Sequence, residues 1–173
     1  MKPLAGFTHK ESAAALRRSA KNVISRESVI CEKSFPVQGG TFENAGQASA
    51  QVKALLKRMK FAEEVVRRAA IVTYEAEMNV CAYAEHGNIV LRVTPEHITI
   101  EVADEGQGIA DIELAMKEGF STATEEIRHM GFGAGMGLSN IKSFSDVFHI
   151  TSETGKGTHL EMVIRINKDR DGA

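Results

Sequence analysis

The sequence predicts an α+β fold in which helices cover one face of an antiparallel-rich sheet. Apolar residues recur at steps of three and four over residues 45–83, which is the period of amphipathic helices. Apolar and polar residues alternate over residues 89–102 and again over residues 147–166, which is the period of strands. Because each of these strands is apolar on one face only, the sheet is expected to bury a single face against the helices.

The early part of the chain is predicted to be mainly helical. A polar leader is expected over residues 1–28, and its segment HKESAAALRRSAKNV (residues 9–23) has the spacing of a short amphipathic helix. The sequence leaves open whether that helix packs on the domain, mediates homodimerisation or frays. The next predicted elements are a short strand over residues 34–37, ended by a Gly-Gly pair, a helix over 45–59 and a helix over 62–83.

Two hairpins are predicted in the later part of the chain. The first has strands over residues 89–93 and 98–102, preceded by a break at the sequence HGN (residues 86–88), and the second has strands over 147–152 and 158–166. A short helix near residues 112–116, a polar loop over 119–130 and a helix over 138–145 are expected between them. The domain is therefore expected to span residues 29–167, followed by a charged, disordered tail over 168–173.

Composition narrows the classes of function. The formal net charge is −2 and the isoelectric point is near 6.3, which argues against nucleic acid or an anionic membrane as partner. Apolar runs are too short to cross a membrane and the N-terminus lacks the apolar region of a signal peptide, so a cytoplasmic protein is expected. Cys31 and Cys81 form no CxxC motif and are expected to be two buried thiols, and the six histidines lack the spacing of a transition-metal site.

The helix over residues 62–83 carries two polar residues beside its apolar stripe. Glu75 and Asn79 are four residues apart, so they lie on one face of the helix, one turn apart. A carboxylate and a carboxamide next to the core are costly unless they are hydrogen-bonded or line a cleft. The alternative is a structural pair that caps a neighbouring loop. Glu77, by contrast, is expected to be a solvated surface charge.

The segment VADEGQGI contains the pattern D-x-G-x-G, formed by Asp104, Gly106 and Gly108. An aspartate at the end of a strand can present its carboxylate to a pocket, and glycines allow a planar group to approach the backbone closely. The alternative is an ordinary turn, since Asp and Gly both favour turns.

The stretch GFGAGMGL (residues 131–138) has a glycine at every second position. It lacks the P-loop pattern, and it follows a polar loop rather than the strand that a dinucleotide-binding fingerprint requires. It is not a linker, because Leu138, Ile141 and Phe144 begin an apolar-faced helix immediately. The stretch therefore predicts a flexible loop that leads into a helix N-terminus, where backbone N–H groups suit phosphate oxygens.

Taken in order, these segments resemble the motifs of the GHKL (Bergerat-fold) ATPase and kinase superfamily. EAEMN (75–79) is similar to its N box, DEGQGI (104–109) and GFGAGMGL (131–138) to its two glycine boxes, and GKGTHLEM (155–162) to its closing strand pair. The chain looks in particular like the anti-sigma factor and serine/threonine protein kinases of bacterial partner-switching systems. This resemblance implies a two-layer α/β sandwich with an antiparallel-rich mixed sheet.

The resemblance also implies roles for individual residues. Glu75 would be the general base, Asn79 the Mg²⁺ ligand, and Asp104 the acceptor of the adenine amino group, with Gly108 leaving space for the ring. Arg128 is either a cation of the ATP lid or a solvated arginine. The residues implied to bind nucleotide are Asn79, Asp104, Gly106, Gly108, Ile109, Gly131, Gly133, Ala134, Gly135, Met136, Gly137, Leu138 and Thr158.

The implied function is an ATP- and Mg²⁺-dependent serine/threonine protein kinase. It would phosphorylate a small STAS-type antagonist protein and thereby control a sigma factor or another signalling partner. Two alternatives remain open, namely an ATP-gated protein-binding switch with little catalysis and a detached histidine-kinase-like catalytic domain. Within the glycine stretch, Gly131 and Gly133 are expected to let the lid fold, while Gly135 and Gly137 bring the backbone onto the phosphates.

Overall fold

The structure is a computed structural model and describes residues 28–166. The predicted leader helix and the predicted C-terminal tail over residues 168–173 lie outside the described residues. The elements follow in the order β1 (Cys31–Gln38), α2 (Gln47–Arg58), α3 (Glu63–Tyr83), β2 (Ala84–Val93), β3 (His97–Gly106), α4 (Ile112–Ala115), α5 (Glu125–His129), α6 (Gly137–Phe144), β4 (Val147–Glu153) and β5 (Gly157–Arg165).

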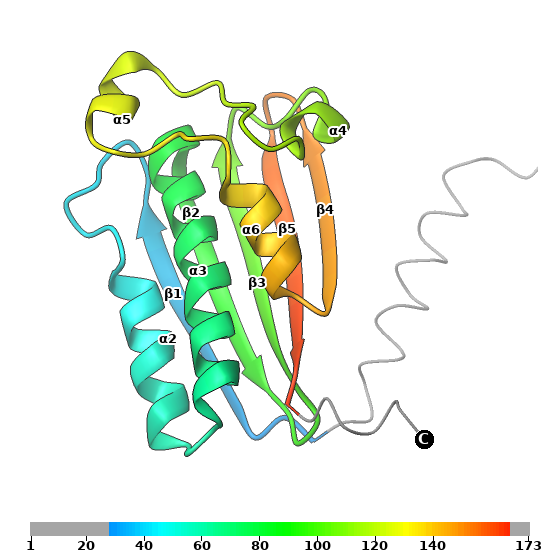
Figure 1. Ribbon diagram of the computed structural model, residues 1–173. Helices are drawn as coiled ribbons and strands as arrows, with labels where there is room; N and C mark the ends of the chain where they lie inside the picture. Colours follow the sequence, from blue (N-terminus) through cyan, green and yellow to red (C-terminus); the bar gives the residue numbers. More distant parts are fainter. Residues whose placement is uncertain (1–27, 167–173) are drawn as a thin grey trace, which may run out of the picture.

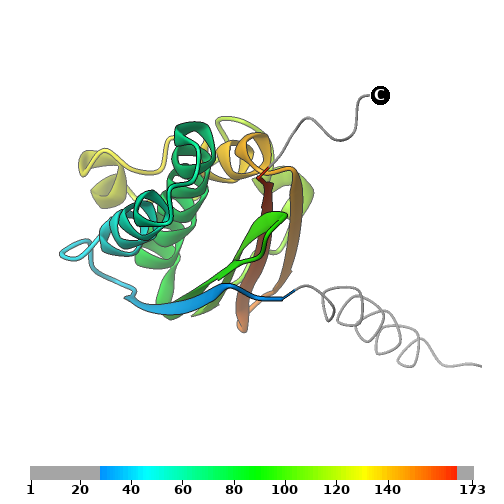
Figure 2. The ribbon, with the colours of Figure 1, turned by 90° about the horizontal axis from the view of Figure 1, so that it is seen from below.

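The predicted two-layer sandwich is confirmed. One five-stranded sheet has the order β1-β2-β3-β5-β4, and α2, α3 and α6 cover one of its faces (Figures 1 and 2). Every neighbouring pair is antiparallel, so the sheet contains no parallel pair among the described strands. The two helices between β1 and β2, α2 and α3, run in opposite directions. They therefore return the chain to the end of the sheet at which β1 finishes, so that β2 runs antiparallel to β1.

The core lies between α3 and the covered face of the sheet. The apolar stripe predicted for α3 is buried along its whole length, from Val65 to Val80. It faces fully buried sheet residues such as Leu91, Ile100 and Met162. Burying a side chain of this size contributes about 1.5–3 kcal/mol, so this interface supplies much of the stability of the domain.

The strand β2 begins earlier than the sequence suggests. Residues 86–88, expected as a break before the strand, belong to β2, which starts directly after α3 with a register shift between Ala84 and His86. A Cβ atom on Gly87 would lie 2.9 Å from Cγ1 of Val80. The glycine that resembles a turn signal is therefore a site of close approach between β2 and α3.

The polar connection over residues 119–130 is not entirely a loop, because it contains the short helix α5. Thr124 begins this helix, and its Oγ1 accepts a hydrogen bond from the amide of Ile127 at 3.3 Å. Glu125 and Glu126 occupy the first turn, where they interact favourably with the helix dipole. These local signals were present in the sequence.

Glu77 is not a solvated surface charge, since it is only 2% exposed. Its Oε1 accepts a hydrogen bond from the amide of Ala48 and its Oε2 accepts one from the amide of Ser49, each at 3.0 Å. The N-cap of α2 is Gly46, which has no side chain to satisfy these amides, so a carboxylate from α3 does so instead.

Two expectations from composition concern the cysteines and the membrane. Cys81 is buried, whereas Cys31 is only half-buried, so the expectation of two buried thiols holds for one of them. In the part of the chain that the structure describes, no helix combines the length and apolarity needed to cross a bilayer. Residues 28–166 also hold no group of three or more His, Cys, Asp or Glu side chains arranged for a metal ion.

Candidate functional site

The residues singled out by the sequence gather at one end of the sandwich, the upper end in Figure 1. The C-terminal end of α3, the end of β3, the β4–β5 turn and the start of α6 all lie there. Close backbone approaches tie these segments together: Gly106 packs on the carbonyl of Tyr83, and Gly157 packs on that of Asp104. Segments more than 50 residues apart therefore form one site.

Glu75 and Asn79 face the first turn of α6. A Cβ atom on Gly137 would lie 3.4 Å from Oδ1 of Asn79 and 3.5 Å from Oε2 of Glu75. Oε1 of Glu75 accepts a hydrogen bond from Nδ2 of Asn140 at 2.8 Å. The pair thus lines the junction between α3 and α6, and the missing side chain of Gly137 leaves space in front of it.

Asp104 lies at the end of β3, beside the start of β5. Its Oδ1 accepts a hydrogen bond from the amide of Thr158 at 3.2 Å. Burial raises the pKa of the Asp104 carboxyl above its ordinary value, and the amides of Thr158 and Gly106 oppose this effect. The carboxylate is therefore held in a partly desolvated position, which suits an acceptor for a polar ligand group.

A pH-dependent stability is expected from Asp104. Since its folded-state pKa is raised, this group favours the folded state most below the unfolded pKa of about 3.9 and loses that contribution as pH rises through the folded pKa. Asp104→Asn keeps an oxygen that can accept from Thr158 but removes the charge. Without ligand, the variant is expected to be at least as stable as the natural chain at pH 7, and its relative advantage should vanish near pH 3. Urea unfolding at both pH values measures this difference, and a variant that is less stable at pH 7 would contradict it.

Ser152 was not identified from the sequence, yet it connects three parts of the site. Its Oγ accepts a hydrogen bond from the amide of Ile109 at 2.8 Å and donates one to the carbonyl of Gly157 at 2.9 Å. The hydroxyl of Thr158 lies 3.0 Å away and, because Ser152 has one hydrogen, Thr158 donates in that contact. The predicted second hairpin places Ser152 opposite Thr158, so the signal was available.

Close packing within the protein explains why residue 108 is a glycine. Its φ is +68°, in the left-handed region, and a Cβ atom there would overlap the carbonyl of Glu153 at the end of β4. The amide of Gly155 also donates to the carbonyl of Gln107 at 2.8 Å. The segment after Asp104 is thereby fixed against the β4–β5 turn.

Residues 119–136, which we call the lid segment, are closed at their base by the glycine stretch. The amide of Gly119 donates to the carbonyl of Gly135 at 2.9 Å, and Gly135 has a φ of +74° with the backbone of Phe120 in the place of a side chain. Gly133 packs on Ala123, whereas a Cβ atom on Gly131 would meet nothing within 4 Å.

The four alternating glycines therefore differ from the expected division into two pairs. Gly133 and Gly135 both pack inside the lid segment, and only Gly137 faces Glu75 and Asn79. Among the other residues of the stretch, Ala134 and Met136 are exposed and Leu138 is half-buried against the core. No side-chain hydrogen bond caps the first turn of α6, which begins at Gly137 in front of Glu75 and Asn79.

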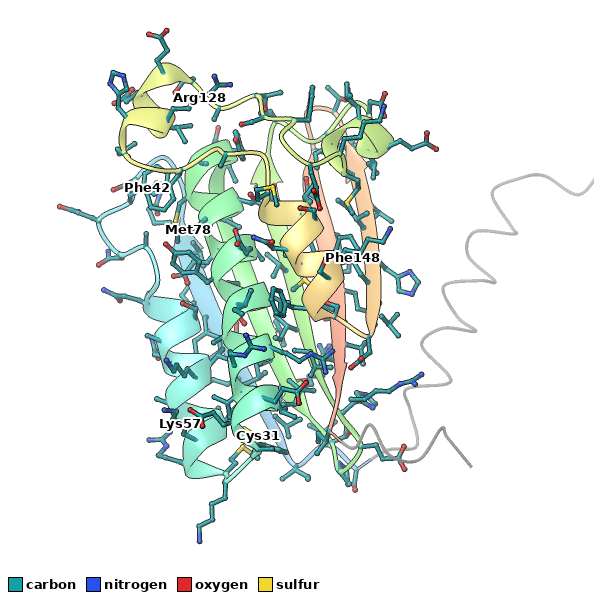
Figure 3. All side chains as sticks on the ribbon, viewed as in Figure 1. Cys31, Phe42, Lys57, Met78, Arg128 and Phe148 are labelled. Atoms are coloured by element: carbon teal, nitrogen blue, oxygen red, sulfur yellow. The ribbon has the colours of Figure 1, made fainter. Side chains whose placement is uncertain are left out.

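The lid segment also lines an open cavity of about 410 Å³, which contains Arg128. Figure 3 shows Arg128 near α5 at the outer end of the molecule, and its Nη2 lies 3.5 Å from the carbonyl of Ser121. Such a long contact leaves the guanidinium free to turn towards an anion. The other lining residues are Gly119, Ser121, Gly131, Phe132, Gly133 and Ala134.

A stacked aromatic pair holds the lid segment against the connection between β1 and α2. The rings of Phe42 and Phe132 are 4.7 Å apart at their centroids and 7° from parallel, and Figure 3 shows Phe42 below the lid segment. Such pairs contribute about 0.5–1.5 kcal/mol beyond the area that they bury. The lid segment is therefore attached at a second point, away from its base.

The site suits an elongated ligand. Glu75 and Tyr83, which packs on Gly106 next to Asp104, are eight residues apart on α3, or roughly 12 Å along its axis. One end offers the Asp104 carboxylate, and the other offers uncapped amides of α6 beside the oxygens of Glu75 and Asn79. A ligand with a polar ring at one end and an anionic group at the other matches this arrangement.

The chain is similar to known proteins in sequence and in fold. Residues 40–164 match the model of the family described as "Histidine kinase-like ATPase domain". An anti-sigma F factor of Thermoanaerobacter sp. (strain X514) is 33% identical over 126 residues, which cover 73% of this chain and 80% of that protein. The serine/threonine-protein kinase RsbT of Bacillus subtilis (strain 168) is 32% identical over 104 residues, which cover 57% of this chain and 72% of the relative.

One solved structure is similar to this chain in fold but not in sequence. A chain in the crystal structure of the SiaB–SiaC complex from Pseudomonas aeruginosa superposes with a TM-score of 0.52 at 13% identity, covering 90% of this chain and 99% of that chain. The family model covers most of the described residues, and the anti-sigma F factor exceeds 30% identity over most of both chains. The chain belongs to the family of histidine kinase-like ATPase domains.

Proposed function

We propose that the chain is an ATP-dependent serine/threonine protein kinase whose substrate is a small STAS-type antagonist protein. It would thereby regulate a sigma factor or another signalling partner in the cytoplasm. The observation that carries this proposal is the placement of Glu75 and Asn79 in front of the uncapped first turn of α6, across the space at Gly137. The relatives named as an anti-sigma F factor and a serine/threonine-protein kinase support it.

ATP would lie along the end of α3. Asp104 would accept a hydrogen bond from the adenine amino group, held in place by the amide of Thr158. The amides at the start of α6 and the glycine stretch would bind the phosphates, with the positive end of the helix dipole directed at them. Arg128 lines the cavity of the lid segment and would supply a cation there.

The residues present fit a magnesium ion. Mg²⁺ prefers oxygen ligands and is usually held by one or two protein groups together with substrate phosphates and water. Oδ1 of Asn79 is such an oxygen, and it faces the space at Gly137. Asn79 would hold the ion, which when bound would neutralise phosphate charge.

Glu75 would act as the general base. Its Oε2 faces the same space, so it would take the proton of a substrate serine or threonine hydroxyl. The hydroxyl oxygen then forms a bond to the γ-phosphorus of ATP. The bond from that phosphorus to its bridging oxygen breaks, and the electron pair leaves with ADP.

The direct test incubates the purified chain with Mg-ATP and a STAS-type antagonist protein, and identifies the product by mass spectrometry. An acid-stable phosphoserine or phosphothreonine is expected with the natural chain and none with Asp104→Asn, which should not retain the nucleotide. An acid-labile phosphoprotein would instead favour a histidine-kinase-like activity. Nucleotide-dependent binding of the antagonist without transfer would favour a protein-binding switch.

A further inference from the structure

We propose that Asn140 is a positioning residue that selects which oxygen of Glu75 faces the reacting groups. The inference rests on the proposed function, because it assigns a partner to the proposed general base. Its basis is the hydrogen bond from Nδ2 of Asn140 to Oε1 of Glu75 at 2.8 Å, which joins two residues 65 positions apart in the sequence.

The two oxygens of Glu75 have different surroundings. Oε1 is engaged by Asn140, while Oε2 lies 3.5 Å from the position of a Cβ atom on Gly137. Gly137 and Asn140 are three residues apart on α6, so they lie on the same face of that helix. One face of α6 therefore leaves space for the phosphate at Gly137 and, one turn later, fixes the carboxylate that borders this space.

The side chain of Asn140 is not needed by its own helix. The backbone amide of Asn140 already donates to the carbonyl of Met136 at 2.9 Å, as in any helical turn. The side chain extends instead to α3, where a donor to a carboxylate makes one of the stronger kinds of hydrogen bond. Without it, the carboxylate of Glu75 would be free to rotate about its terminal torsion, which has a broad energy minimum.

The position of Asn140 is itself determined by α3. At the far end of α6, Nε of Arg68 donates to the carbonyl of Phe144 at 3.0 Å. Arg68 and Glu75 are seven residues apart on α3, so they lie on one face, two turns apart. The C-terminal end of α6 is thus attached to α3 one turn beyond Asn140, which helps to hold the donor of Asn140 beside the proposed base.

The experiment is a double-mutant cycle on the rate of phosphotransfer to the antagonist protein, and on ATP hydrolysis by the chain alone. Asn140→Ala is expected to lower kcat about 10- to 100-fold, the range for a lost hydrogen bond to a charged group, with ATP affinity changed less than about threefold. In a Glu75→Gln background, the same substitution should change the remaining rate less than about twofold, because Asn140 acts only through Glu75.

Two further variants separate positioning from structure. Asn140→Asp keeps the shape but replaces the donor with a like charge, so it should lose at least as much activity as Asn140→Ala. Ser143→Ala removes an exposed hydroxyl from the last turn of α6, away from the proposed phosphate site, and should stay within about twofold of the natural rate. Thermal unfolding verifies that each variant folds.

The outcomes distinguish this inference from the proposed function. Equal losses from Asn140→Ala in both backgrounds, or a fall in ATP affinity as large as the fall in kcat, would overturn the positioning role while leaving the kinase intact. Absence of both phosphotransfer and ATP hydrolysis in the natural chain would overturn both proposals.

Discussion

Replacing Glu75 with glutamine is expected to lower the rate of phosphotransfer at least about 100-fold, because glutamine cannot take up the proton of the attacking hydroxyl. The substitution keeps the shape of the side chain, and its amide oxygen can still accept the hydrogen bond that Asn140 donates to Oε1. The affinity for ATP should therefore change little. Single-turnover transfer from labelled ATP measures the first quantity, and isothermal titration calorimetry measures the second.

Glu63→Gln is the matched control for this prediction. Glu63 lies in the first turn of the same helix, is exposed, and is three turns away from the site. Its replacement should leave the rate within about twofold of the natural value. If Glu75→Gln transferred phosphate as fast as this control, Glu75 would not be the base. If it lost ATP binding instead, Glu75 would belong to the nucleotide contacts.

Replacing Arg68 with methionine is expected to lower the free energy of unfolding by about 3 kcal/mol, because its guanidinium makes two charge-assisted hydrogen bonds and each such bond contributes about 1.5–3 kcal/mol. Nη2 of Arg68 lies 2.8 Å from Oδ2 of Asp146, and the two side chains are only 7% and 19% exposed. The same Asp146 oxygen accepts from the amide of Arg165 at 2.7 Å. The substitution would remove the buried guanidinium from both the Asp146 carboxylate and the Phe144 carbonyl.

Arg67→Met provides the control for Arg68. Arg67 precedes Arg68 on α3, but it is exposed, and its guanidinium carbon lies 5.7 Å from the centroid of the Phe144 ring. Its replacement should cost at most about 1 kcal/mol. Thermal unfolding should show a fall in Tm of about 10 °C for the Arg68 variant and a much smaller fall for the Arg67 variant. Similar falls for both would mean that the ion pair contributes little.

The periodic segments of the fold were predictable because local patterning decides them. The stripe of α3 and the alternation in β2 and β3 predict both the element type and the buried face, and the structure confirms both. The start of β2 was less predictable because it is decided by packing: Gly87 resembles a turn signal, yet it allows β2 to pass close to Val80. The sheet order also depends on contacts between distant segments, which no local pattern records.

In the site, too, residues in local motifs were predictable, whereas their distant partners were not. Glu75, Asn79 and Asp104 lie in short sequence motifs, and the structure brings them to one end of the sandwich. The residues that hold such groups in place are distant in sequence. Asn140 is 65 residues from Glu75, and Glu77 caps a helix that begins about 30 residues earlier. Glu77 was wrongly expected to be a surface charge because its partners are distant in sequence and nothing near it indicates them.

The insertion of β5 between β3 and β4 has a consequence for how such a protein can diversify. Because β3 pairs directly with β5, the whole chain between them, including the lid segment, is an excursion from an intact pair of strands. Lengthening such an excursion is inexpensive: each doubling of its length costs only about 0.6 kcal/mol in closure entropy. Insertions and replacements in the lid segment should therefore leave the sheet folded. This segment can then change in evolution and bind new partners while the rest of the domain keeps its structure.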